Sequence, residues 1–204
     1  MPPVYTAFFL WVASAILWWS GWREQAEDRI PDAAVAVFLA GWPFAAWAAI
    51  PAGGPWTISG TFAWAALAAL FLAWRLEPSE RWTAFAAGFL TGSFKLLISV
   101  SPWMSTHLSD EGVGWTAAVL AGASTCALVR GATGQILAVT LALAVHEIWR
   151  AAWLHGQVRF EIGSGHWMEA WWVAVLTARS LSAIGRLVAL DFRKYAWRRG
   201  GEGS

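Results

Sequence analysis

The chain has few charged residues and a single cysteine. Charged residues make up 13% of its 204 residues, hydrophobic residues make up 58%, and the mean hydropathy is +0.49. Soluble domains carry about 25% charged residues, so this composition argues against a soluble fold and indicates an integral membrane protein. The lone Cys126 excludes an intrachain disulfide and any site that needs paired cysteines.

Recognisable catalytic motifs are also missing. His146 and Glu147 begin like the zinc-protease pattern HExxH, but Arg150 stands where the second histidine ligand belongs. Residues 162–167, IGSGHW, lack the first glycine of a nucleophile elbow. His107 and His166 fall in predicted loops, which disfavours a haem site. We therefore predict a non-enzymatic protein with no catalytic residue, no metal site, no cofactor and no nucleic-acid partner.

Long apolar segments are the main feature that is present. Each approaches the length that crosses about 30 Å of hydrocarbon at 1.5 Å per residue, and prolines or glycines separate them. They predict an all-α fold, a polytopic transmembrane helix bundle of about seven spans in a single domain over 1–190. The fifth segment is the shortest, and it is either a full span or a tilted, re-entrant one. The segments are 3–22, 32–50, 56–75, 82–101, 114–129, 133–153 and 168–190.

The distribution of cations between the predicted loops gives an orientation. With the N-terminus outside, nine cations face the cytoplasm and only Arg159 lies outside, which is a strong positive-inside bias. We therefore expect a multi-pass protein of the bacterial cytoplasmic (inner) membrane, with the C-terminus inside. The N-terminus lacks the basic region of a cleaved signal, so we expect the first segment to be kept as a helix. The nine cations are Arg23, Arg29, Arg75, Arg81, Arg130, Arg193, Lys194, Arg198 and Arg199.

Residues 191–204 form a basic, aromatic segment that we expect to be a cytoplasmic tail. Aromatic side chains alternate there with cations, a composition suited to anionic lipid headgroups. Membrane lipids are thus the expected partners, together with a membrane-protein partner or a further copy of the chain. The predicted anchoring residues are Arg193, Lys194, Trp197, Arg198 and Arg199.

Ionisable residues inside the predicted spans form the candidate site. Such groups are costly when they face lipid, so they are expected to turn inward and pair. Comparing depths places Glu169 at the outer rim, Arg179 near mid-membrane and the others in the outer third. We predict that they converge in the outer half of the bundle. This predicted charge cluster comprises Lys95, His146, Glu147, Arg150, Glu169 and Arg179.

Lys95 lies on a stripe of small residues that suits close helix packing. The stripe consists of Ala84, Gly88, Gly92, Lys95 and Ser99. Three interpretations of the cluster remain open: a polar clasp that fixes helix packing, a site for an anionic lipid or coupling ion, or a proton relay through His146 and Glu147. A polar cavity that reaches Lys95 would favour binding, whereas a dry core with Glu147 directly paired would favour the clasp.

Tryptophan is abundant, with 18 residues, and most lie near predicted helix ends, where indole rings suit the membrane interface. A second interpretation is an outer aromatic vestibule around the charge cluster. Its members would be Trp103, Trp153, Trp167 and Trp171 or Trp172.

Two short motifs carry a resemblance. The stretch SGW at 20–22 and the stretch WWVAVLTARSLS at 171–182 resemble the YphA family, small membrane proteins of endospore-forming Firmicutes. The resemblance implies a sporulation-linked membrane protein without catalytic residues. We therefore expect an assembly or scaffold protein of the spore envelope. The alternative is a small transporter or binding protein that uses Lys95, Glu147 and Arg179 as its site.

Overall fold

The computed structural model describes residues 3–20, 30–53, 56–101, 110–153 and 160–200. These residues form an all-helical bundle, which confirms the predicted all-α class. Each of the seven predicted segments coincides with a helix. The helices are α1 (Pro3–Trp19), α2 (Asp32–Trp47), α3 (Gly60–Arg75), α4 (Pro78–Val100), α6 (Asp110–Leu128), α7 (Ala132–Trp153) and α8 (Gly165–Gly200).

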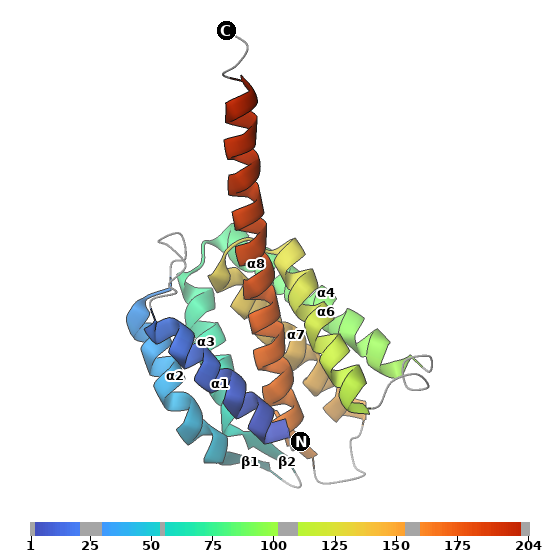
Figure 1. Ribbon diagram of the computed structural model, residues 1–204. Coiled ribbons are helices and arrows are strands. Elements are labelled where there is room, and N and C mark those ends of the chain that lie inside the picture. The colour runs from blue at the N-terminus through green and yellow to red at the C-terminus, as the bar shows by residue number, and fades with distance from the viewer. Residues whose placement is uncertain (1–2, 21–29, 54–55, 102–109, 154–159, 201–204) are drawn as a thin grey trace.

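A small sheet that the sequence analysis missed closes one end of the bundle (Figure 1). Strand β1 (Ala49–Gly53) pairs antiparallel with β2 (Trp56–Ser59), which pairs parallel with β3 (Phe160–Ile162). The helical predictions for residues 49–50 and 56–59 were therefore wrong. Pro51 explains the first error, because proline lacks the backbone N–H that a helix needs and disfavours helical geometry in the residue before it. We call this end of the bundle the sheet end.

Helices α4 and α7 approach each other closely along the predicted stripe. A Cβ added to Gly88 would lie 2.8 Å from the carbonyl oxygen of Ala138, and one added to Gly92 would lie 2.6 Å from that of Ala142. Only glycine fits at such distances, which is how small residues let two helix backbones meet. This confirms the predicted packing face, and it carries Lys95 toward α7.

Helix α8 is the longest element, with 36 residues, and its second half extends beyond the other helices (Figure 1). Residues 191–200 continue this helix, so the predicted boundary at residue 190 is not a break in secondary structure. The side chains of the predicted anchoring residues lie outside the described part of the structure. Their role stays a prediction.

Two helical segments are long and apolar enough to cross a membrane, Ala132–Trp153 and Gly165–Ala189. Four further apolar stretches, of 10–17 residues, are shorter. Every helix also exposes large apolar side chains on the outer surface of the bundle. Examples are Phe9, Phe44, Leu70, Phe89, Leu120, Ile148 and Ile184.

Candidate functional site

A cavity of about 820 Å³ lies near the sheet end, between α4, α6, α7 and α8. We call it the polar cavity, because five of the six residues of the predicted charge cluster line it. Its titratable and hydroxyl-bearing lining residues are Lys95, Ser99, His146, Glu147, Arg150, His166 and Glu169. Four indole rings also line the cavity, those of Trp115, Trp149, Trp153 and Trp167.

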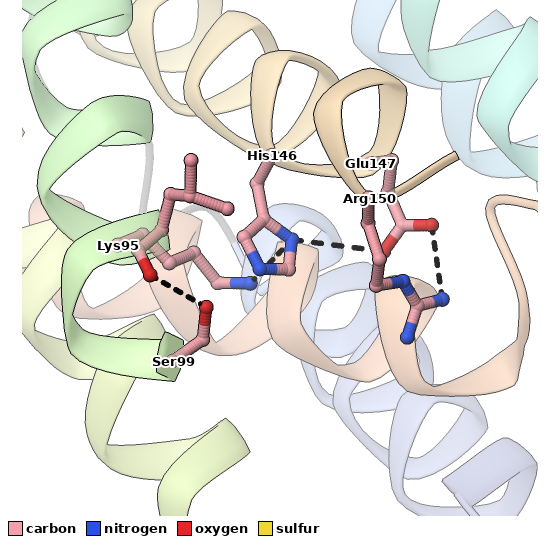
Figure 2. A network of polar contacts seen from close by, with 6 residues as sticks. Lys95, Ser99, His146, Glu147 and Arg150 are labelled. Carbon is pink, nitrogen blue, oxygen red and sulfur yellow. Dashed lines mark hydrogen bonds and ion pairs between the residues drawn. The ribbon is translucent and has the colours of Figure 1, made fainter. Parts of the chain in front are cut away.

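Lys95 reaches from α4 to His146 on α7, and its Nζ lies 3.2 Å from the imidazole Nδ1 (Figure 2). A charged ammonium group only donates hydrogen bonds. It therefore donates to Nδ1, which makes His146 a neutral imidazole with its proton on Nε2. The close α4–α7 packing puts the two side chains within reach of each other.

Glu147 follows His146 on the same helix and is held by a different partner. Its Oε2 accepts a hydrogen bond from Nη2 of Arg150 at 3.3 Å, one helical turn further along α7 (Figure 2). Its Oε1 lies 3.8 Å from Nδ1 of His146, beyond hydrogen-bond range. The glutamate side chain is buried, whereas the Arg150 side chain is 44% exposed at the cavity edge. Glu147 thus pairs with Arg150, whereas Lys95 contacts His146 and makes no ion pair within the described residues.

Glu169 is the second carboxylate of the polar cavity, and it lies on α8. Its residue surface is only 9% exposed. Among the residues that the structure describes, it makes no hydrogen bond or ion pair. As predicted for a member of the charge cluster, Glu169 turns toward the cavity; α8, which begins at Gly165, buries it there. His166, predicted in a loop, lies in the first turn of α8.

Arg179 does not join the cluster, so that part of the prediction was wrong. Its Nη1 donates to Oε1 of Gln135 at 3.3 Å, near the start of α7. Gln135 precedes Glu147 by twelve residues, about 18 Å along a helix. The register between α7 and α8 explains the error: Nε1 of Trp171 donates to Oγ1 of Thr140 at 2.9 Å and fixes how the two antiparallel helices align.

The predicted aromatic vestibule is confirmed only in part. Trp153 and Trp167 line the polar cavity, and Trp103 lies outside the described residues. Trp171 and Trp172 instead pack in the core against Trp42, with ring centroids 5.4 and 5.2 Å from it. The sequence analysis missed Trp115 and Trp149 as lining residues. Trp149 lies three residues after His146, a spacing that puts both on one helix face.

A second cavity, of about 610 Å³, lies toward the opposite end, between α1, α2, α3 and α8. We call it the apolar cavity. Its walls include Phe38, Trp64 and Leu67. Among the described lining residues the only cation is Arg75, which lies over the Phe71 ring at 5.2 Å from the centroid. The described residues contain no group of three or more histidines, cysteines or acids that could hold a metal ion.

Among the described residues, the polar cavity shows no activated nucleophile, and it offers charged groups for binding. Ser99, its hydroxyl residue, donates to the carbonyl oxygen of Leu96 in its own helix at 2.8 Å, and no base activates it. What remains are two cations, two carboxylates and two imidazoles around one space. In comparisons with known protein families, curated proteins and solved structures, none matches this chain.

Proposed function

We propose that this chain is a multi-pass membrane protein that binds a small polar solute in the polar cavity, from the outer side of the membrane. The observation that carries the proposal is the cavity itself, which reaches Lys95 and is lined by both carboxylates. Pockets of 300–1,000 Å³ with a few placed polar groups are typical of small-molecule sites. This favours the binding alternative over the packing clasp, although Glu147 is also directly paired.

The exposed surface supports the membrane setting. Soluble monomers rarely expose large continuous apolar areas, and here every helix presents large apolar side chains outward. Helices of 16 or 17 residues span about 24–26 Å. They are a few Å short of a typical bilayer core, a mismatch that local thinning accommodates.

Exposed tryptophans support the same setting, because they gather at the two ends of the bundle. Indole rings prefer the interface between headgroups and acyl chains. Two belts at opposite ends are therefore the arrangement expected of spanning helices. The sheet-end belt is Trp47, Trp115, Trp149 and Trp153, and the opposite belt is Trp19, Trp74 and Trp82.

The orientation follows from the cations. Arg75, Arg81 and Arg130 lie at the end opposite the sheet, and the positive-inside rule puts that end in the cytoplasm. The sheet end and the polar cavity then face outward. The scaffold role linked to spore-envelope assembly stays a prediction. The exposed apolar side chains of Ile184 and Leu187 in the second half of α8 are the surface on which such a role would rest.

Cysteine labelling in intact cells tests this proposal. In a Cys126→Ala background, Ser99→Cys places a thiol in the polar cavity, and Ser79→Cys places one at the first turn of α4, at the opposite end. We expect a membrane-impermeant maleimide to label the Ser99→Cys protein in intact cells and the Ser79→Cys protein only after permeabilisation.

Two substitutions test whether labelling at position 99 depends on an open cavity, one that fills the polar cavity and a matched control that does not. Gly114 lines the polar cavity, Gly185 does not, and a Cβ at either position meets nothing within 4 Å. Gly114→Phe should slow labelling at position 99, whereas Gly185→Phe should leave it unchanged. Failure of the Ser99→Cys protein to react, or reaction of the Ser79→Cys protein from outside, would contradict the proposal.

A further inference from the structure

We propose that the solute of the polar cavity is a small zwitterion, whose ammonium group pairs with Glu169 and whose acidic group lies toward Lys95. This inference rests on the proposed function and names the chemical class of the ligand. It follows from two charged lining residues, Lys95 and Glu169, which make no ion pair within the described residues.

Glu169 supplies the negative wall. A carboxylate is expensive to bury without a partner. Only 9% of the surface of Glu169 is exposed, and its carboxylate makes no hydrogen bond or ion pair within the described residues. It also lines the cavity directly. The structure therefore leaves this carboxylate for a group that enters the cavity, and an ammonium cation is the natural counterion.

Lys95, on α4, supplies the positive group. Its Nζ contacts the imidazole of His146, whereas Glu147 pairs with Arg150, so the Lys95 ammonium makes no ion pair within the described residues. The hydrogen bond to His146 uses one of the three N–H groups of this ammonium, which leaves donors for a ligand oxygen. An anionic group is therefore the natural partner for Lys95.

Lys95 and Glu169 carry opposite charges, yet they make no ion pair with each other. An anion would satisfy Lys95 and leave Glu169 unmatched, and a cation would do the reverse. A zwitterion places an opposite charge beside each group, and such pairing is strong in a weakly solvated site. The indole rings of Trp115, Trp149 and Trp153 at the cavity wall also suit an alkylammonium group, because aromatic faces attract cations.

Calorimetry with three probes tests the inference. Phosphoethanolamine carries both charges, ethanolamine only the ammonium, and inorganic phosphate only the anion. The full chain is placed in nanodiscs of phosphatidylglycerol, which contain no zwitterionic lipid. We expect phosphoethanolamine to bind at least about tenfold more tightly than either single-charge probe, a difference typical of losing one charge-assisted contact.

Glu169→Gln is the decisive variant, and Glu161→Gln is its matched control, because Glu161 is exposed on β3 and does not line the cavity. Glu169→Gln should weaken phosphoethanolamine binding at least about tenfold and leave phosphate binding unchanged. The variant should unfold at the same temperature as the parent or a higher one, since it loses no ion pair and removes the cost of an unpaired buried charge. Equal phosphoethanolamine affinity in the parent and Glu169→Gln proteins would overturn the inference.

The zwitterion has two sources, a free solute or a lipid headgroup. Nanodiscs that contain phosphatidylethanolamine distinguish them: a headgroup ligand would block soluble phosphoethanolamine there and would co-purify with the parent but not with Glu169→Gln. Binding in neither arm would overturn the inference. If Ser99→Cys is labelled from outside while the probes fail to discriminate, the proposed function stands and only the ligand class is wrong.

Discussion

The two cavities of this bundle are built in opposite ways. The polar cavity is lined by hydrogen-bonded and ion-paired side chains of α4 and α7, whereas Glu169 of α8 makes no hydrogen bond or ion pair within the described residues. The apolar cavity is bounded by aromatic and aliphatic side chains, beside the packed rings of Trp42, Trp171 and Trp172. The contrast indicates that stability and binding depend on two different regions. Aromatic packing stabilises the region between α2 and α8, whereas the charged side chains between α4 and α7 are suited to bind a ligand.

The largest effect is expected on the side of the apolar cavity. Trp42 is 2% exposed and packs against two other indoles. Trp42→Ala should lower the free energy of unfolding by about 3–5 kcal/mol, the usual cost of removing a buried aromatic side chain. Thermal unfolding in detergent measures this loss. Stability equal to that of the parent would show that aromatic packing does not hold this region together.

A smaller loss is expected at the paired carboxylate. Glu147→Gln removes the carboxylate that pairs with Arg150 and attracts the Lys95 ammonium at longer range. Removing one partner of a buried pair costs about 3–5 kcal/mol, but Arg150 is 44% exposed, so we expect a loss of about 2 kcal/mol. Adding Lys95→Met should restore part of it, as a double-mutant cycle would reveal. Strictly additive losses would argue against coupling between these charges.

Disturbing the close contact between α4 and α7 should lower the stability by a comparable or slightly smaller amount. Gly92→Ala places a methyl group against the carbonyl oxygen of Ala142, and such overpacking costs about 1–3 kcal/mol. Gly114→Ala is the matched control, since its Cβ meets nothing within 4 Å. Alanine is favoured over glycine in a helix by about 0.5–1 kcal/mol, so the control should be neutral or stabilising. Equal unfolding temperatures for the two variants would exclude the tight α4–α7 contact.

The smallest effect is expected from filling the apolar cavity. Ala68→Leu adds apolar atoms to a wall of this cavity and should stabilise the bundle by about 0.5–1 kcal/mol, as cavity-filling changes commonly do. Phosphoethanolamine binding should not change, because Ala68 does not line the polar cavity. A change in that binding would mean that the two regions are coupled.

The sequence predicted the helices well, because long apolar runs and proline or glycine breaks are local signals. It also placed Lys95 on a packing face, since the spacing of Gly88 and Gly92 is visible along one helix. It could not align α7 with α8. That register depends on contacts between helices, such as the one from Trp171 to Thr140, and it moves Arg179 away from the cluster.

The burial of Glu169, the second carboxylate of the polar cavity, also depends on contacts between helices, which the sequence does not show. The sequence placed Glu169 at the outer rim as a member of the charge cluster, but it could not predict which contacts α8 would give this side chain. The sheet was missed because its strands are only 3–5 residues long. Strands this short pair across the chain and leave little periodic signal.

The most direct test of the central claim is an experimental density map of the chain in lipid nanodiscs. The account predicts water or solute density in the polar cavity in contact with the Glu169 carboxylate, and Glu147 paired with Arg150. A cavity closed by side chains, with Glu169 bound directly to Lys95 or Arg150, would contradict it.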